Sequence, residues 1–494
     1  MRQTNGLVLL SAMLLVAVAP GCSALHPVPP TTVAAAPSAQ PVLGAPIEVA
    51  GIRQADTKPG QSESLAAPRP VPAESATGAL PVFTNLAELS ADAVMEQVLA
   101  RSPSLGEMVA AWRVAQARFP QVTSLEDPMF AATIGPGTIA PDDNGVEFAY
   151  RLEISQRLPY PGKLKLRGEN ALAEAAAAGH NVGDIRLQLA EAARVAFYDY
   201  YLAERGLEVN ADSLDLLRKF KANAETRYKT GLVPQQDILQ ADVEIGRERD
   251  RRLGLEQMRK VAISRINTLM HLPPDIPLPP SAKQLTMPTT VAGAPALRTM
   301  ALSRRPDLLA LAERIRAEEA QLGLAHKEFY PDFEPFFMYD RFMGNTSDNR
   351  DLAAMLGVRT NLPVYKARRY GAIAEAEARI AQRRAELANH TDQVNHQVQE
   401  AYEKVVQGAQ SIELYEQTIL PAAKANVESA QAAYITGKIA FLTLVEAQRS
   451  QIGLRDRYYE TLADYFRRRA TLERVVGGPP GTWFAENARP GEPK

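Results

Sequence analysis

A helical period of hydrophobic and polar residues runs through most of the chain from about Ala91 onward. The longest stretch without helix breakers is residues 163–229. Its apolar residues recur three and four positions apart, at Val182, Ile185, Leu189, Ala192 and Ala196. One helix of this length would extend about 100 Å. Such a helix cannot fold into a globule, so we expect the long helices to pack along one another as coiled coils.

A second helical stretch, residues 366–435, repeats this pattern later in the chain. Pro421 lies inside it and is expected to kink or interrupt the helix, because proline has no amide N–H and clashes with the preceding turn. The helix that follows carries its apolar residues on one stripe, at Leu454, Tyr458, Leu462 and Tyr465. The stripe indicates an amphipathic helix.

Short interruptions of the helical pattern show the period-two alternation of β-strands. Residues 148–155 and 352–359 alternate in this way, and residues 129–134 and 332–339 are the strand candidates that precede them. A polar, glycine-rich loop separates the members of each pair, at residues 141–145 and 344–349. We therefore predict two β-hairpins. Pro335 lies inside the second hairpin and weakens it, because proline cannot donate to the sheet ladder.

The chain contains this pattern twice, at an offset of 203 to 206 residues. Tyr, Thr, Gly and Ala return 206 residues apart, and the matched residues are Tyr228 with Tyr434, Thr230 with Thr436, Gly231 with Gly437 and Ala241 with Ala447. Matches at an offset of 203 are Pro103 with Pro306, Leu105 with Leu308, Pro128 with Pro331 and Glu174 with Glu377. The unit is far longer than a solenoid repeat, so the chain is a duplicated domain. The expected copies are residues 83–285 and 286–477, followed by a flexible tail at 478–494.

A strand of about 9 to 11 residues is long enough to cross an outer membrane, and lipid tolerates strands only in a closed barrel. Four strands cannot close a barrel, since the smallest transmembrane barrels have about eight. Several copies of the chain would therefore share one barrel. The alternative is a soluble four-stranded sheet attached to a coiled-coil protein.

The first residues have the composition of an export signal, expected at 1–21. Arg2 supplies the positive charge. Residues 7–18 form an apolar core that is too short to anchor in a bilayer, and residues 19–21 form a small-residue cleavage site. Cys22, the only cysteine, follows as in a bacterial lipobox and is expected to carry a lipid. An ordinary cleaved signal with an incidental cysteine is the alternative. Residues 22–82 are rich in Pro, Ala, Thr and Ser, which predicts a disordered tether.

Composition excludes several classes of function. The net charge of −2 comes from balanced acids and bases without a basic stripe, so nucleic acid is not an expected partner. The sequence has no glycine-rich phosphate loop, no zinc-protease motif and no nucleophile elbow. His390 and His396 are six residues apart, which places them on different helix faces and argues against a metal site. We expect no catalysis, no cofactor and no bound metal.

Residues 85–477 resemble the TolC-type outer-membrane efflux proteins. The resemblance lies in the duplication, in LPYPGKLKLRG at 158–168 with its partner LPVYKARRYG at 362–371, and in the stretch from Ile419 to Gln448. It implies a fold that is mainly α with a small β part: a homotrimer with a twelve-stranded transmembrane β-barrel, four strands from each copy, that continues into a long α-helical coiled-coil barrel across the periplasm. The basic residues Lys163, Lys165 and Arg167 are expected to mark the periplasmic end of the barrel.

The resemblance also implies functional residues at the hairpin tips and the tunnel entrance. Gly231 and Gly437 are suited to reverse the chain with φ > 0. The residues expected to dock onto a periplasmic adaptor are Tyr228, Gly231, Leu232, Tyr434, Gly437 and Lys438. Members of the family carry acids six and nine residues after the second tip glycine. Here these positions are Thr443 and Glu446, so one ring of carboxylates is expected, and the first copy has Asp237 and Gln240 instead.

These features predict a passive export duct in the bacterial outer membrane, lipid-anchored at Cys22 and embedded in outer-membrane lipid, that works with a periplasmic adaptor protein and an inner-membrane efflux pump. The proline-glycine-lysine entry to the long helix and the lipoprotein start resemble the branch that exports heavy-metal cations. Drugs or a secreted protein remain alternative substrates. The rival from another class is a structural coiled-coil lipoprotein or scaffold without a channel.

Overall fold

The computed structural model describes residues 83, 86–135, 146–287, 292–344 and 353–478, all of which belong to one compact unit that begins at Ala76. The predicted signal peptide, Cys22, the tether, both glycine-rich hairpin loops and nearly all of the C-terminal tail lie outside the described residues. The described elements follow one order twice: two helices, a β-hairpin and a long helical hairpin.

The elements of the first copy are α1 (Ala91–Arg101), α2 (Pro103–Thr123), β1 (Met129–Gly135), β2 (Val146–Ser155), α3 (Lys163–Lys229) and α4 (Gln235–Leu269). Those of the second copy are α5 (Ala294–Arg304), α6 (Pro306–Lys327), β3 (Phe333–Gly344), β4 (Ala353–Thr360), α7 (Lys366–Leu414), the π-helix η1 (Tyr415–Ile419), α8 (Leu420–Ile435) and α9 (Phe441–Val476). The duplication is therefore complete at the level of secondary structure.

The predicted long helices are confirmed. α3 begins and ends where its breaker-free stretch does, after Gly162 with φ of 93° and before the turn at Thr230. The second stretch is interrupted near Pro421, as expected: η1 ends two residues before this proline, which is the second residue of α8. Pro421 has no N–H to donate to the preceding turn, so the regular helical hydrogen bonds are interrupted there. A single π-turn commonly accommodates such an interruption.

The two predicted hairpins are confirmed, and they join into one antiparallel sheet in the order β1-β2-β3-β4. Pro335 does not disrupt β3. It lies opposite Val358, and on its other side its carbonyl oxygen accepts a hydrogen bond of 3.1 Å from the Gln156 N–H. Because only the carbonyl is needed there, the missing N–H of proline costs the sheet no hydrogen bond on that side.

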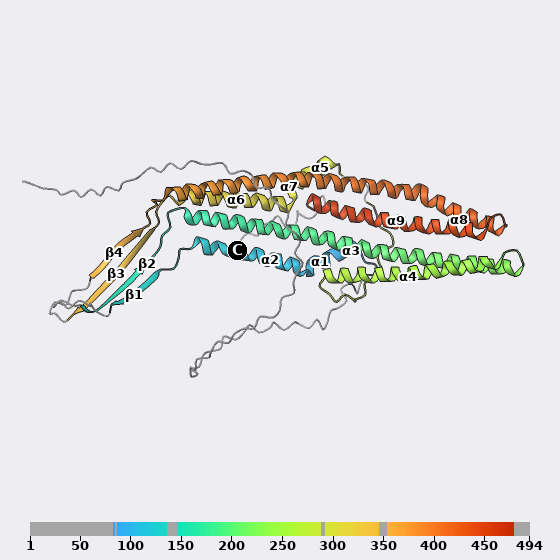
Figure 1. The fold of residues 1–494 in the computed structure, drawn as a ribbon, viewed down its shortest axis with the longest axis horizontal. Helices are drawn as coiled ribbons and strands as arrows, with labels where there is room; N and C mark the ends of the chain where they lie inside the picture. The colour runs from blue at the N-terminus through green and yellow to red at the C-terminus, as the bar shows by residue number, and fades with distance from the viewer. Residues whose placement is uncertain (1–82, 84–85, 136–145, 288–291, 345–352, 479–494) are drawn as a thin grey trace, which may run out of the picture. The chain divides into compact units, whose positions relative to one another are not determined.

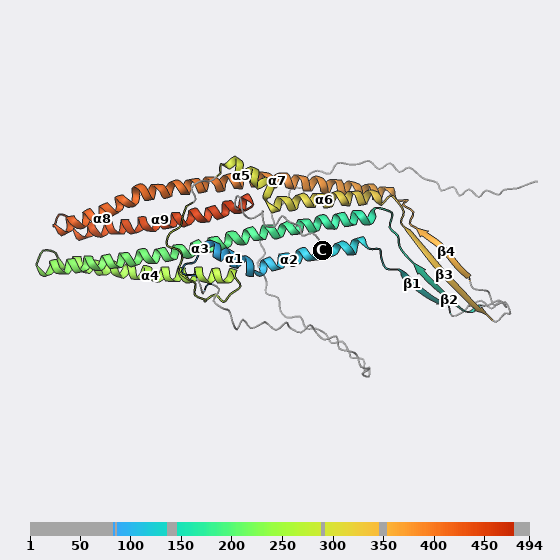
Figure 2. The ribbon, with the colours of Figure 1, turned by 180° about the vertical axis from the view of Figure 1, so that it is seen from behind.

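The helices next to the sheet follow the order of the strands. α2, α3, α6 and α7 lie side by side in this order, each the continuation of β1, β2, β3 or β4 through a short connection (Figures 1 and 2). The sheet lies at one end of this unit, and the hairpins α3–α4 and α8–α9 extend to the other end. The second strand of the first copy and the first strand of the second copy thus form the boundary between the two halves.

Two hydrophobic clusters hold the long helices together. The larger one lies where α1, α3, α5, α7 and α9 meet, around Phe197, Tyr200 and Tyr201 of α3. Leu462 and Tyr465 of the predicted α9 stripe are buried in it, whereas Leu454 and Tyr458 are half-buried. The smaller cluster lies between the hairpins α3–α4 and α8–α9 near their tips. Each fully buried large apolar side chain contributes roughly 1.5–3 kcal/mol, so these clusters fix the pairing of the helices.

Candidate functional site

The four-stranded sheet has one apolar face. Phe130 lies opposite Ile154 on the neighbouring strand, and Ile154 lies opposite Phe337. Phe337 lies opposite Leu356, whose side chain is 86% exposed. A contiguous exposed apolar surface of this kind is unfavourable in water and indicates contact with lipid or another apolar phase.

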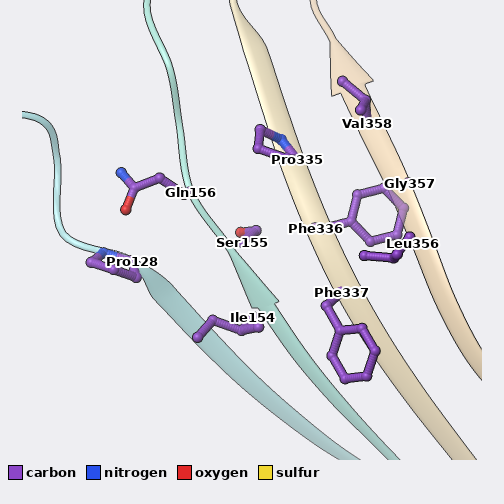
Figure 3. Close-up of a pocket in the computed structure, with 10 residues that line it drawn as sticks. All are labelled: Pro128, Ile154, Ser155, Gln156, Pro335, Phe336, Phe337, Leu356, Gly357 and Val358. Atoms are coloured by element: carbon purple, nitrogen blue, oxygen red, sulfur yellow. The ribbon is translucent and has the colours of Figure 1, made fainter.

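A shallow hollow of about 560 Å³ lies on the sheet close to the connections with the helices (Figure 3). Of the residues that line it, only Ser155 and Gln156 have polar side chains. Gln156 already donates to the carbonyl oxygen of Glu126, 2.6 Å away. Because few polar groups remain to orient a bound molecule, the hollow is better explained as part of the apolar face than as a ligand site.

The opposite face of the sheet carries ion pairs. Arg151 donates two hydrogen bonds to Asp340, from Nε to Oδ1 at 2.7 Å and from Nη2 to Oδ2 at 2.9 Å. Arg359 donates to Glu334 at 3.1 Å and also to Glu153. Two arginines therefore face three carboxylates, and this surface has an excess of negative charge.

The ring of Phe336 organises this polar face. The guanidinium carbon of Arg359 lies 4.5 Å from the ring centre of Phe336, within the range of a cation–π contact. The ring also covers Gly357, where an added Cβ atom would lie 2.4 Å from Phe336 Cζ. Only glycine leaves room for the ring in this position, and the ring in turn supports the arginine.

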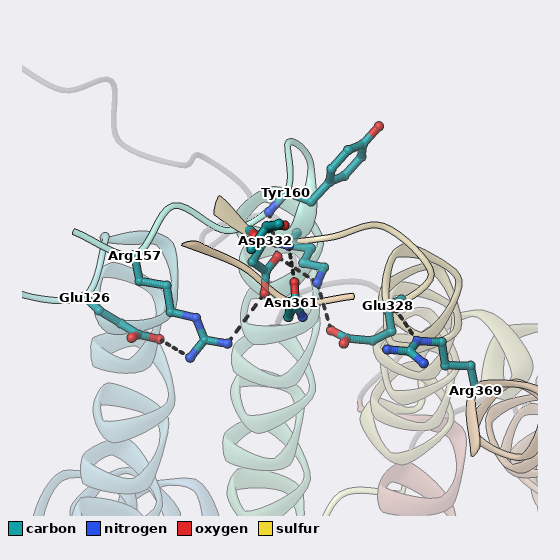
Figure 4. A network of polar contacts seen from close by, with 9 residues as sticks. Glu126, Arg157, Tyr160, Glu328, Asp332, Asn361 and Arg369 are labelled. Atoms are coloured by element: carbon teal, nitrogen blue, oxygen red, sulfur yellow. Dashed lines mark hydrogen bonds and ion pairs between the residues drawn. The ribbon is translucent and has the colours of Figure 1, made fainter. Parts of the chain in front are cut away.

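A polar network ties the sheet to the helices at their junction (Figure 4). The Asp332 carboxylate accepts hydrogen bonds of 2.8 Å from Lys163 Nζ and from the Tyr160 N–H. Lys163 Nζ also lies 3.3 Å from Glu328 Oε1, and the Asp332 N–H donates to Asn361 Oδ1 at 2.6 Å. Lys163 and Tyr160 belong to the first copy and the other residues to the second. The network therefore joins the two halves of the chain.

Lys163 is completely buried at this junction. Burial acts to raise the pKa of its partner Asp332, but the hydrogen bonds from Lys163 and Tyr160 outweigh it, so the pKa of this carboxyl lies below its usual range. Of the three basic residues expected near the barrel end, Lys163 has a structural ion pair, whereas Lys165 is largely exposed.

The two hairpin tips have the same backbone geometry. Gly231 and Gly437 have φ of 74° and 75°, so the predicted positive φ is confirmed. In the first tip the Leu232 N–H donates to the Arg227 carbonyl, and in the second the Lys438 N–H donates to the Ala433 carbonyl, both at 2.9 Å. These bonds close the end of the first helix of each hairpin.

The side chains of the two tips differ. Leu232, Lys438 and Tyr228 are exposed, and Tyr228 is 45% exposed. Tyr434, the counterpart of Tyr228, is only 3% exposed. The Tyr434 ring packs against Phe441 inside the hairpin, and docking of an adaptor at the two tips stays a prediction.

Hydrogen bonds and ion pairs connect the two hairpins near these tips. The Tyr434 hydroxyl donates to Asp237 Oδ2 at 3.0 Å, and Arg227 donates to the Tyr434 carbonyl. Further along, Arg449 of α9 donates to the buried carboxylate of Glu244 in α4, from Nε at 2.8 Å. The bond from Arg449 holds the pKa of Glu244 below its usual range. Sequence reasoning missed these contacts.

Glu446 and Thr443 are both exposed on α9. Glu446 has no hydrogen bond or ion pair within the described part of the chain. Its charge contributes to raising the pKa of Arg449, after the larger effects of the Glu244 hydrogen bond and charge. Asp237 differs because it accepts the Tyr434 hydrogen bond. The meeting of Glu446 carboxylates from several copies stays a prediction.

The histidines singled out in the sequence lie apart. His390 Nε2 is 2.7 Å from Asp307 Oδ2, and His396 is exposed next to Glu400. Within the described ranges, no group of three or more His, Cys, Asp or Glu side chains is placed to hold a metal ion. In the same ranges, none of the helices carries an apolar stretch that could span a bilayer.

Comparison with known proteins identifies relatives of this arrangement. Residues 297–478, most of the second copy, match the family described as outer membrane efflux protein. The cobalt-zinc-cadmium resistance protein CzcC of Cupriavidus metallidurans is 25% identical over 310 residues, which are 62% of this chain and 70% of the relative.

Two solved structures share the fold. The outer-membrane channel OprN superimposes with a TM-score of 0.67 at 20% identity, over 79% of this chain and 90% of that chain. The outer-membrane protein VceC of Vibrio cholerae superimposes with a TM-score of 0.66 at 21% identity, over 78% of this chain and 96% of that chain. At these identities the likeness establishes the fold.

The fold defines a class of outer-membrane channel proteins that combine an α-helical barrel with a β-barrel. Residues 297–478 match the outer membrane efflux protein family, and the chain as a whole shares the fold of the solved outer-membrane channels. The predicted fold class, mainly α with a small β part, is confirmed.

Proposed function

We propose that the protein is the outer-membrane channel of a tripartite efflux system and that it conducts its substrates passively. The observation that carries this proposal is the two-faced sheet, apolar on one face and ionic on the other. Among the described residues, its outer edges, β1 and β4, are unpaired. Lipid favours such a sheet only when its edges are closed. A homotrimer of residues 83–285 and 286–477 would close it with twelve strands.

Heavy-metal cations are the proposed substrate class. The relative from Cupriavidus metallidurans is named for resistance to cobalt, zinc and cadmium. The ionic face of the sheet has more carboxylates than arginines, and a negatively charged wall favours cations over anions. Drugs remain the second candidate substrate class.

The hairpin tips are the proposed docking surface for a periplasmic adaptor, which would connect the channel to an inner-membrane pump. Leu232 and Lys438 are exposed at the two tips. A Cβ atom added at Gly231 would meet nothing within 4 Å, and one added at Gly437 would lie 3.7 Å from Arg227 Nη2. Tyr228 adds an exposed aromatic ring on the first tip only. Apolar and backbone groups presented together at the end of a helical hairpin suit recognition by another helical protein.

The protein is further proposed to be anchored by a lipid on Cys22, after removal of residues 1–21, with residues 22–82 as the tether. Mass spectrometry of the mature N-terminal peptide tests the lipid directly. A mature chain that begins elsewhere, or carries an unmodified cysteine, contradicts the anchor without affecting the channel.

Deletion of the gene in its host, followed by measurement of metal retention, tests the proposed function. We expect the deletion to raise cell-associated cobalt, zinc or cadmium and the full-length protein to reverse this. If the deletion raises cell-associated drugs rather than metals, and the full-length protein reverses this rise, the second substrate class is favoured. Unchanged retention of both, with an intact envelope, favours a structural lipoprotein scaffold.

A further inference from the structure

A cluster of one lysine and two tyrosines lies where α3 begins and α6 ends, next to the sheet. The rings of Tyr160 and Tyr330 are stacked, with their centres 4.5 Å apart. Lys327 Nζ lies 5.4 Å from the ring centre of Tyr160 and 5.6 Å from that of Tyr330, within the range of cation–π contacts. Tyr160 belongs to the first copy and the other two residues to the second, so the cluster forms only when the two halves of the chain pack together.

The ammonium group of Lys327 has no carboxylate partner. Among the residues that the structure describes, it makes no hydrogen bond and no ion pair. Its neighbour Glu328 lies instead 3.3 Å from Lys163 Nζ. The ring faces attract the ammonium but accept none of its three hydrogen bonds in the usual geometry. Because Lys327 is only half-buried and Tyr330 is 47% exposed, an anionic oxygen from outside the protein can reach this group.

A strip of apolar side chains joins this cluster to the hollow on the sheet. Phe333, Pro335 and Phe337 are two residues apart along β3 and therefore share the apolar face. Pro335 and Phe337 line the hollow (Figure 3), and Phe333 is 42% exposed next to it. The backbone of Phe333 pairs with that of Leu158, which is two residues before Tyr160. The strip thus ends at the lysine and tyrosine cluster.

The Tyr160 ring lies on the apolar side of the junction. Figure 4 shows this ring directed away from the Asp332 carboxylate, which contacts Lys163. Asp332 directly precedes Phe333, and successive side chains of an extended chain point to opposite faces. The cluster, the strip and the hollow therefore follow one another along the same face.

The dimensions and the chemistry of this face match those of a phospholipid. The strand from Phe333 to Phe337 extends about 13 Å, close to the depth of about 15 Å that one leaflet contributes to the hydrocarbon core. An acyl chain needs no polar partner, which agrees with the almost entirely apolar lining of the hollow. The cation and the tyrosines lie at the end of the strip, where such residues meet the polar headgroups of a membrane.

We propose that this face binds one phospholipid from the leaflet on the helix side of the membrane, with its phosphate on Lys327 Nζ beside Tyr160 and Tyr330 and an acyl chain in the hollow. The site goes beyond conduction and rests on one part of the proposed function, the insertion of the sheet in lipid. Since α3 and α6 are the two middle helices of the layer α2, α3, α6, α7, the site lies away from the outer edges at which a barrel would close. Each copy of the chain therefore carries its own lipid site.

Native mass spectrometry of the delipidated full-length protein tests the phosphate contact, with two lipids that have the same acyl chains. One is a phosphatidylglycerol, and the other is a diacylglycerol, which lacks the phosphate. We expect the phosphatidylglycerol to bind at least about tenfold more tightly, as one hydrogen bond to a charged group provides, and Lys327→Ala to abolish this difference. Lys165→Ala is the matched control, because Lys165 also lies at the start of α3, with its side chain 80% exposed and only Glu169 as an ion-pair partner.

Filling the hollow tests the contact with the acyl chain. Val358 lines the hollow, so Val358→Trp should weaken the binding of both lipids equally. Phe130→Trp is the control, because Phe130 is exposed on the same face and does not line the hollow. Circular dichroism of each variant confirms that the protein is folded.

Three results would overturn the lipid site. They are equal binding of the two lipids to the wild type, a difference that persists in Lys327→Ala, and loss of the difference in Lys165→Ala as well. Displacement of the phosphatidylglycerol by an equal concentration of inorganic phosphate would also overturn it, because the site would then be a general anion site.

Conductance of the same preparation in planar bilayers separates this failure from failure of the channel. Protein that conducts ions without preferring the phosphatidylglycerol keeps the channel and loses the lipid site. Protein that prefers the phosphatidylglycerol without conducting ions keeps the lipid site and loses the channel. Protein that stays in solution without detergent and binds neither lipid overturns both.

Discussion

The Tyr434 hydroxyl donates a hydrogen bond to the Asp237 carboxylate, 3.0 Å away, and so links the tip of the second hairpin to the first helix turn of α4. Residues 197 positions apart in the chain meet here at the end of the two hairpins. If the tips surround the entrance of a channel, the entrance cannot widen between these hairpins without breaking this bond.

Removal of this bond should open the entrance. We expect Tyr434→Phe to reduce the free energy of unfolding by only about 1 kcal/mol, as for one hydrogen bond, and to raise single-channel conductance in planar bilayers. Tyr228→Phe is the matched control, because this exposed tyrosine of the other tip has no side-chain hydrogen bond in the described structure. If Tyr434→Phe has the conductance of the wild type, this hydrogen bond does not control the opening of the channel.

The same link should be insensitive to pH over the physiological range. Burial, and secondarily the neighbouring Asp237, raise the pKa of Tyr434 to about 12. The folded state thus favours the protonated hydroxyl, whose contribution is complete below the ordinary tyrosine pKa of about 10 and is lost as the pH rises through about 12.

The junction between sheet and helices should be the most sensitive polar site for stability. Asp332→Asn leaves the ammonium of Lys163 buried without its main counter-charge, and removal of one partner of a buried pair typically costs about 3–5 kcal/mol. We expect a matching fall in thermal stability, measured by circular dichroism. Lys163→Met in the same chain should recover most of the loss. Glu126→Gln, which affects an exposed pair at the same junction, should change stability by less than about 1 kcal/mol.

Acid should reproduce this loss in the unmodified protein. Because the pKa of Asp332 is lowered in the folded state, its stabilisation is present above the ordinary aspartate pKa of about 4 and is lost as the pH falls below it. An acid-induced fall in melting temperature that persists unchanged in Asp332→Asn would assign the effect to other carboxylates.

The tip glycines should be needed for export and not for folding. Gly231→Val and Gly437→Val place a β-branched residue at a φ near 75°, which strains the turn by roughly 1–3 kcal/mol far from the sheet and the larger core. We expect a normal amount of protein in the membrane and loss of metal or drug export. Gly453→Val, in a helix with open space around it, is the control. Full export by both tip variants would exclude the tips from the mechanism.

Glu446 is predicted to favour cations at the entrance. When carboxylates from several copies converge, Glu446→Gln should reduce the preference for cations over anions in planar-bilayer recordings, and Thr443→Glu should increase it. Asp250→Asn is a better control than a substitution of Asp237, because Asp250 is exposed without an ion pair in the described structure, whereas Asp237 holds Tyr434. If Glu446→Gln, Thr443→Glu and Asp250→Asn all show the same preference for cations over anions, Glu446 is an ordinary solvated residue.

The fold could be predicted from sequence where one periodicity persists over many residues. Helical spacing placed the ends of α3 at Lys163 and Lys229. Proline chemistry predicted a kink or interruption at Pro421, and the structure has a π-turn just before it. Alternation located β2 and β4, and the polar loops before them located β1 and β3, although β3 extends five residues beyond the predicted Tyr339. The positive φ at Gly231 and Gly437 followed from the requirement for a tight reversal between helices.

The contacts at the candidate sites could not be predicted in the same way, because they depend on how distant segments pack. Tyr228 and Tyr434 occupy the same motif, yet only Tyr434 turns into the space between the hairpins. Glu244 and Arg449 lie 205 residues apart and share no motif, so their pairing became visible only with the packing of α4 against α9. Lys163 was expected to mark the periplasmic end of the barrel, but its burial next to Asp332 of the second copy could not be predicted, because the two residues are far apart in the chain.

The ion conductance of the purified full-length protein in planar lipid bilayers tests the central claim most directly. The proposed channel predicts discrete conductance steps that increase with salt concentration and disappear when the protein is omitted. A trimer that inserts into the same bilayers without raising their conductance, even when Tyr434→Phe breaks the link between the hairpins, would contradict the channel.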